Sequence, residues 1–169
     1  GKSKGWITAL PGRKMDKYFG NDNFIAHKRE IDKQEQGLSE HLDNVSELTG
    51  KFAAKIGLRK EGDLIGFLHD LGKASVEFDK YIRSATGLIE PDEADYVDVA
   101  GKKGKIDHST AGAQYIEENL VGENFADIQK KLIIQVLRLC IISHHSGLID
   151  CLGPNGEDIY GKRMAKSAE

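Results

Sequence analysis

Histidines are the residues of this 169-residue chain with the clearest capacity for chemistry. Six are present, His27, His41, His69, His108, His144 and His145, and Asp70 follows His69 directly. A neutral imidazole coordinates transition metals, and a carboxylate binds divalent cations. If the fold gathers these side chains, they would form a metal centre of the kind that activates water for hydrolysis.

The apolar pattern around the histidines indicates that most of them face the interior. His41 precedes Val45 by four residues and Leu48 by seven, so it lies on the apolar face of its predicted helix. His144 continues the apolar face to which Leu137 belongs. A polar ring without a partner is costly in such a position. One shared metal centre would provide partners for all of these rings.

Two pairs of adjacent residues carry further information. Side chains of consecutive helical residues point about 100° apart, as 3.6 residues per turn requires. His144 and His145 can therefore meet at one ion only where the helix ends, and Ser146-Gly147 supplies that end. In the His69-Asp70 pair the same divergence lets the imidazole bind one ion while the carboxylate bridges to a second.

Hydrophobic periodicity predicts that helices position these residues. The sequence lacks a convincing strand, so we expect an all-α fold with helices over residues 38–56, 64–71, 76–85, 108–120 and 125–143. Gly57 and Gly72 would end the first two helices, while Asp63 and Asp107 would cap the second and fourth. The His69-Asp70 pair would then lie in the last turn of the second helix, and His108 in the first turn of the fourth.

The last predicted helix has an apolar side that we expect to be buried. It comprises Ile128, Leu132, Ile133, Val136, Leu137, Cys140 and Ile141. Residues 86–106 are rich in glycine and charge, so we expect a poorly ordered loop there, and the tail after Gly147 is also predicted to be a loop. Residues 1–14 are interpreted as an expression remnant, with an irregular leader as the alternative. A single domain would then span residues 15–169 from Met15.

Composition limits the classes of function. The net charge is −3, without the basic surplus typical of proteins that bind nucleic acid through phosphates. Contact with phosphate would have to be local, through a metal or the lysines of residues 102–105, which otherwise form a solvated loop. No apolar run approaches the length of a membrane span. Two cysteines provide no disulfide framework and fit a cytoplasmic protein, with Cys140 expected in the core.

Four longer strings surround the candidate ligands in chain order. They are Ser39-Glu40-His41-Leu42, Phe67-Leu68-His69-Asp70-Leu71-Gly72-Lys73, Asp107-His108-Ser109-Thr110-Ala111-Gly112-Ala113 and Ser143-His144-His145-Ser146-Gly147-Leu148. The chain thereby resembles the HD phosphohydrolase superfamily, and in particular the HD nuclease domain of the CRISPR-associated helicase-nuclease of type I systems. The resemblance covers residues 25–150.

This resemblance implies an all-helical domain that cleaves single-stranded DNA without ATP, using one or two divalent ions. His41 and His69 would hold one ion, and His108, His144 and His145 the other, with Asp70 as the bridge. Imidazole-rich sites suit manganese, nickel, cobalt or iron better than magnesium. The partners implied are single-stranded DNA, a helicase domain or subunit and the CRISPR surveillance complex. No association with a membrane is expected.

Three nearby residues have alternative interpretations. Lys73 would place its ammonium on a phosphate oxygen or on developing charge, or it is a cation favoured by the helix C-terminus. Ser109 would donate a hydrogen bond behind the ligands, or it is an ordinary first-turn residue. His27 belongs to an Ala26-His27 string similar to the start of the family, and we interpret it as a packing or surface residue.

The chain departs from the family pattern in one respect. Family members carry a further aspartate in a later helix, and the domain is expected to be truncated before its last helices. Asp150 and Asp158 are weak substitutes, so the ion held by His41 and His69 is expected to bind less tightly. Two other functions remain open: an HD phosphohydrolase acting on nucleotides or cyclic nucleotides, and an inactive module that docks to a helicase.

Overall fold

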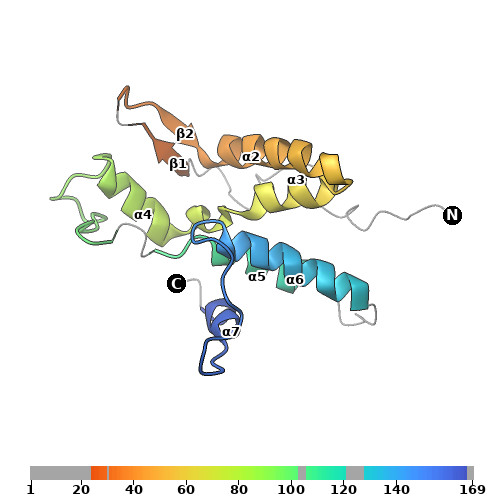
Figure 1. The fold of residues 1–169 in the computed structure, drawn as a ribbon. Helices are drawn as coiled ribbons and strands as arrows, with labels where there is room; N and C mark the ends of the chain where they lie inside the picture. Colours follow the sequence, from red (N-terminus) through yellow and green to blue (C-terminus); the bar gives the residue numbers. More distant parts are fainter. Residues whose placement is uncertain (1–23, 30, 103–105, 121–127, 167–169) are drawn as a thin grey trace.

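The structure is a computed structural model that describes residues 24–29, 31–102, 106–120 and 128–166, and in these ranges it is mostly helical (Figure 1). Its helices are α2 (Leu38–Ala53), α3 (Arg59–Leu68), α4 (Val76–Ala85), α5 (Thr110–Leu120), α6 (Ile128–Ser143) and α7 (Ile159–Met164). Single 3-10 turns at Ala54–Ile56 and Leu71–Ala74 follow α2 and α3. Over the described part of the chain, none of these helices has both the length and the apolarity to cross a bilayer.

Several predictions about element boundaries are confirmed. α2 and its 3-10 turn end at Gly57, whose φ of 78° is the left-handed conformation that glycine adopts easily. α4 has the predicted bounds, and the described residues between Ala85 and Asp107 form no helix or strand. The predicted leader at 1–14, Met15 and the predicted start of the last helix at Phe125 lie outside the described residues.

α2 and α3 form an antiparallel pair that glycines allow to pack closely. A Cβ on Gly66 of α3 would lie only 2.6 Å from the Val45 carbonyl oxygen of α2, so no larger residue fits there. The Thr49 hydroxyl donates a hydrogen bond to the Gly62 carbonyl at 2.7 Å. These contacts fix the start of α2 relative to the end of α3.

The main core lies where α3 meets the antiparallel pair formed by α5 and α6. Its buried members are Leu64, Leu68, Ala113, Ile116, Leu137, Ile141 and Ile142. Burying one large aliphatic side chain contributes about 1.5–3 kcal/mol, so this cluster is the principal source of cohesion among the three helices. A smaller cluster of Ala26, Leu38 and Leu42 joins β1 to the start of α2.

The antiparallel pairing determines where the candidate ligands meet. The start of α2, the end of α3, the start of α5 and the end of α6 lie close together near the middle of the molecule (Figure 1). Each of these four ends carries at least one of the histidines singled out above.

The prediction that the chain lacks strands was wrong. β1 (Ile25–Lys28) and β2 (Glu35–Gly37) form an antiparallel hairpin just before α2. The pairing is irregular between Ile25 and His27, which is the position of a β-bulge. Ile25 and Ala26 are buried, so contact with the rest of the fold stabilises a hairpin too short to be stable alone.

Four local predictions also need correction. α3 begins at Arg59, so Asp63 lies within the helix instead of capping it. α3 ends at Leu68, which places His69 and Asp70 just after its last turn and before the second 3-10 turn. His108 precedes α5, which begins at Thr110, so Asp107 does not occupy the predicted cap position, although its carboxylate accepts from the Thr110 amide at the first residue of the helix. The tail after Gly147 contains α7.

The apolar side of α6 is only partly covered by the described residues. Leu137, Ile141 and Ile142 are buried, whereas several members of the predicted buried side are exposed: Ile128, Leu132, Ile133, Val136 and Cys140. On α2, Phe52 is 59% exposed and Leu48 is 52% exposed. The apolar stripes of both helices are thus wider than the surfaces that α3 and α5 cover.

Gly112→Ala should destabilise the protein. A Cβ on Gly112 of α5 would overlap the Leu68 carbonyl oxygen at the end of α3, and a backbone group cannot move aside cheaply. We expect the free energy of unfolding to fall by about 1–3 kcal/mol, as for other overpacked interiors. The measurement is chemical denaturation. Gly37→Ala is the control, because a Cβ there meets no atom within 4 Å; equal stability of the two variants would contradict the close approach of α5 to α3.

Candidate metal centre

The Asp70 carboxylate is the centre of the histidine cluster. Its side chain is 4% exposed, and its two oxygens face different sets of imidazoles. Oδ1 faces His144, His108 and His145, with Nε2 atoms at 3.2, 3.5 and 3.8 Å. Oδ2 faces His41 and His69, with Nε2 atoms at 3.1 and 3.2 Å. The structure therefore brings all six predicted ligands together and divides them as the family resemblance implied.

The Oδ1 side contains the fuller set of ligand atoms. One ligand atom each from Asp70, His108, His144 and His145 lies within 4.8 Å of every other. His108 and His145 approach most closely, with their Nε2 atoms 2.7 Å apart. This group could hold one metal ion through four protein ligands.

Backbone carbonyls determine which nitrogen of three imidazoles carries the proton. The Nδ1 atoms of His69 and His144 lie 2.7 and 2.6 Å from the Gly66 and Ile141 carbonyl oxygens. In each case the carbonyl belongs to the last turn of the preceding helix, and the Ile141 carbonyl also accepts from the His144 amide at 3.4 Å. The Nδ1 of His108 similarly lies 3.1 Å from the Ile106 carbonyl. A carbonyl can only accept, so these Nδ1 atoms donate.

This proton assignment turns lone pairs toward the carboxylate. A neutral imidazole that donates from Nδ1 has only a lone pair at Nε2. The Nε2 atoms of His69 and His144 nevertheless lie 3.2 Å from Asp70 oxygens, which also carry lone pairs. Two acceptors repel at that distance unless a proton or another cation lies between them. Hydrogen bonding from Nδ1 to a backbone carbonyl is also the usual arrangement of metal-bound histidine.

The surrounding charges favour an ionised Asp70. Burial opposes ionisation, but the contacts with His144, His41 and His69, which can donate to the carboxylate when their rings carry both protons, together with the Lys73 charge, hold the pKa of the carboxyl far below its usual range. Burial also opposes a charge on His144, yet its contacts with Asp70 and the Ile141 carbonyl raise its pKa. The carboxylate at the centre of the cluster is therefore anionic and attracts positive charge.

Two outer imidazoles favour their neutral forms. Burial, together with repulsion from the neighbouring His144 and His108 rings, lowers the pKa of His145. Burial and the neighbouring Lys73 ammonium lower the pKa of His27 to about 4. A neutral imidazole keeps the lone pair that a metal ligand requires.

Lys73 is buried beside the carboxylate. Its ammonium lies 3.0 Å from Asp70 Oδ2 and donates a hydrogen bond to the Ala26 carbonyl at 3.2 Å. The side chain is 5% exposed. In this position Lys73 neutralises and orients Asp70, while contact with a substrate phosphate would require these bonds to break. Its proposed catalytic role stays a prediction.

The segment before α5 is held by α7, which the sequence interpretation missed. The Arg163 guanidinium donates to the Ser109 hydroxyl at 2.7 Å, and the Lys166 ammonium lies 3.0 Å from Asp107 Oδ2. Although burial opposes ionisation, hydrogen bonds from Thr110 and Lys166 hold the pKa of Asp107 well below its usual range. Ser109, the residue next to His108, is thus tied to α7.

Arg163→Met should weaken metal binding although Arg163 is not a ligand. Without its hydrogen bond to Ser109, His108 would be held less firmly, and loss of such supporting bonds typically costs 10–100-fold in metal affinity. Calorimetric titration with nickel or manganese measures the effect. Lys162→Met is the matched control, because among the described residues the Lys162 side chain, on the same helix, pairs with the exposed Glu157 and with no residue near His108. Equal affinities in the two variants would mean that α7 does not position His108.

Three other candidates have different positions. Asp158 caps α7 by accepting from the Gly161 amide at 2.6 Å. Among the described residues, neither Asp158 nor Asp150 belongs to a group of potential metal ligands. His27, interpreted from sequence as a packing or surface residue, lies in such a group with His41 and Asp70. The signal that could have found it is an Ala26-His27 string next to the first ligand helix.

Comparisons with known proteins add no assignment: no family model, curated protein or solved structure matches this chain.

Proposed function

We propose that this chain is a metal-dependent phosphodiesterase, an HD-type nuclease domain that cleaves single-stranded DNA in CRISPR interference, a form of antiviral defence. The observation that carries the proposal is the arrangement around Asp70. One buried carboxylate turns each of its oxygens toward a separate set of imidazoles, and the lone pairs of His69 and His144 face those oxygens. A bridging carboxylate between two sets of nitrogen ligands suits a pair of divalent ions.

The donor set fits transition metals. Five imidazoles and one carboxylate favour manganese, iron, cobalt or nickel over magnesium, which prefers oxygen ligands. His108, His144, His145 and Asp70 would hold the first ion. Ions bound here would activate a water and neutralise charge on the phosphodiester oxygens during hydrolysis.

The chain's own residues have separate roles in this proposal. Asp70 holds the two ligand sets together, while the carbonyls of Gly66 and Ile141 orient His69 and His144 by accepting from Nδ1. Lys73 fixes the orientation of Asp70 through its contact with Oδ2. The Phe78 ring lies 5.0 Å from the His108 ring and limits the movement of that imidazole.

The exposed side of α6 supports a protein partner in this system. Ile128, Leu132, Ile133 and Val136 are each at least 50% exposed. Contiguous apolar patches of this kind mark interaction surfaces in soluble proteins. The helicase domain or subunit, within the CRISPR surveillance complex, is the partner that we propose.

Charge favours one alternative function. The net charge of −3 gives no general attraction for a polynucleotide, whereas a nucleotide or cyclic nucleotide could be bound by metal contacts alone. An HD phosphohydrolase acting on such small substrates is therefore the second candidate.

Parallel assays separate these functions. The purified chain, stripped with chelator and resupplied with manganese, nickel or cobalt, would be incubated with labelled single-stranded DNA, duplex DNA, single-stranded RNA and a panel of nucleotides. We expect cleavage of single-stranded DNA that depends on added metal and not on ATP. Turnover of a nucleotide without DNA cleavage would support the second candidate. Metal binding with no hydrolysis of any substrate would favour the inactive docking module.

A further inference from the structure

The Oδ2 side of Asp70 has the spacing of a partly formed coordination shell. The distances among His41 Nε2, His69 Nε2 and Asp70 Oδ2 are 3.1–3.2 Å. Adjacent ligands around an octahedral ion with bonds of about 2.1 Å lie roughly 3.0 Å apart, so the three atoms are already spaced as neighbours in one shell. Three protein ligands nevertheless hold an ion less firmly than the four on the Oδ1 side.

His27 is placed to add a fourth ligand. One ligand atom each from His27, His41 and Asp70 lies within 4.8 Å of the others, and the His27 and His41 ring centroids are 4.8 Å apart. Opposite ligands of an ion with bonds of about 2.1 Å lie roughly 4.2 Å apart. His69 lies outside this group, so His27 would have to shift toward it for all four side chains to share one ion.

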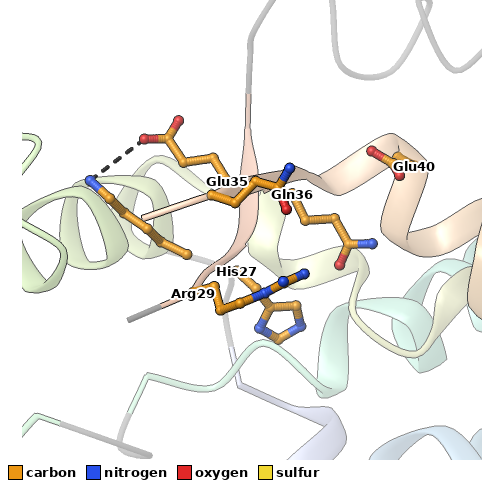
Figure 2. A pocket seen from close by; sticks show the side chains of 7 residues that line it. His27, Arg29, Glu35, Gln36 and Glu40 are labelled. Atoms are coloured by element: carbon orange, nitrogen blue, oxygen red, sulfur yellow. Dashed lines mark ion pairs between the residues drawn. The ribbon is translucent and has the colours of Figure 1, made fainter. Parts of the chain in front are cut away.

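The hairpin explains why His27 reaches the cluster. The irregular pairing between Ile25 and His27 is a bulge, a feature that redirects side chains at functional sites. Ala26, between them, is buried against the start of α2 and fixes this part of β1. His27 also lines a hollow of about 390 Å³ between the hairpin and α2 (Figure 2). His27 is therefore the side chain through which this hollow adjoins the cluster.

A positive charge already lies at this edge. The Lys73 ammonium contacts three acceptors: Asp70 Oδ2 at 3.0 Å, the Ala26 carbonyl at 3.2 Å and His27 Nε2 at 3.4 Å. An ammonium group only donates, so the lone pair of His27 Nε2 points into the cluster. The same groups that surround this ammonium are suited to a metal cation. The two cations would compete for Oδ2.

We propose that His27 is the fourth protein ligand of a second metal position, formed with His41, His69 and Asp70. This position takes a divalent transition metal more weakly than the Oδ1 side, because the bound ion repels the adjacent Lys73 ammonium. The inference rests on the proposed metal centre and identifies its second ion site within this chain.

Binding stoichiometry tests the inference without an activity assay. Nickel would be titrated calorimetrically into the chelator-stripped chain, with bound metal counted by elemental analysis after desalting. We expect two unequal sites in the wild-type chain. His27→Ala and His27→Gln should retain the tighter site and weaken the other at least tenfold. His145→Ala, the matched control, should instead weaken the tighter site. Lys73→Met should strengthen the weaker site at least tenfold by removing the competing charge.

The outcomes separate the two claims. A wild-type chain that binds one nickel ion, or His27 variants that bind two ions with wild-type affinities, would overturn the role of His27 and leave the proposed function standing. A wild-type chain that binds no nickel would overturn the proposed function as well. Thermal melting of each metal-free variant identifies any loss of binding caused by unfolding, and the exposed position of His27 makes both substitutions compatible with folding.

Discussion

Asp70→Asn is expected to reduce metal-dependent hydrolysis at least about a thousandfold. The substitution keeps the shape of the side chain but removes the anionic charge that both ligand sets share. It also replaces one acceptor oxygen by an N–H donor, which cannot bind a cation. A metal centre contributes several kcal/mol to charge stabilisation during hydrolysis, and about 4 kcal/mol corresponds to a thousandfold in rate. Initial rates at matched protein and metal concentrations measure the effect.

Asp43→Asn provides the control for this experiment. Asp43 is an exposed carboxylate on α2, two residues after His41, and belongs to neither group of potential metal ligands. Its variant should retain wild-type rates. Far-UV circular dichroism should show native helix content in both variants. Asp70→Asn with activity within tenfold of the wild type would rule out the bridging role of this carboxylate.

The ligand cluster could be predicted because its residues stand at helix ends. An apolar stripe identified the start of α2, while Ser146-Gly147 indicated where α6 stops and where His144 could turn toward the site. The predicted helix had the His69-Asp70 pair in its last turn, and in the structure the pair comes directly after the last turn of α3. Antiparallel helices bring alternate ends together, so the histidine positions followed from helix boundaries that the periodicity largely defined.

The hairpin and the role of His27 could not be predicted in the same way. β1 has only four residues and does not alternate between apolar and polar positions, while β2 consists of Glu35, Gln36 and Gly37. Neither strand has a local signal that competes with a loop assignment. Their pairing depends on contact with α2, which is a tertiary effect. Periodicity alone therefore left His27 with only a generic packing or surface interpretation.

Two errors at the other end of the chain have different causes. The glycines and proline of residues 153–156 do form a turn, but Asp158 then caps the short helix α7, and this weaker signal was overlooked. Cys140 lies on an apolar stripe that is broader than its covered part, so it is exposed while Leu137 is buried. Periodicity identifies an apolar face but not how much of that face neighbouring residues cover.

Removal of metal is expected to lower the melting temperature by about 5–11 °C. An ion that binds only the folded chain, supplied at 100 times its dissociation constant, stabilises the protein by about 2.7 kcal/mol. For a protein of this size each kcal/mol shifts the melting temperature by about 2–4 °C. The physical source of the stabilisation is the cation's attraction to Asp70 and the relief of repulsion between the carboxylate and the lone pairs of His69 and His144. Differential scanning calorimetry with excess chelator, and then with added manganese, nickel or cobalt, measures the shift.

Asp70→Asn is the control that assigns the thermal shift to this centre. The variant should melt at nearly the same temperature with chelator and with metal, whereas the Asp43→Asn protein should respond as the wild type does. Metal bound by histidines in the unfolded chain would reduce the shift in all variants alike, so the difference between variants is the informative quantity. A wild-type melting temperature that is indifferent to chelator and to added metal would contradict a preformed metal centre around Asp70.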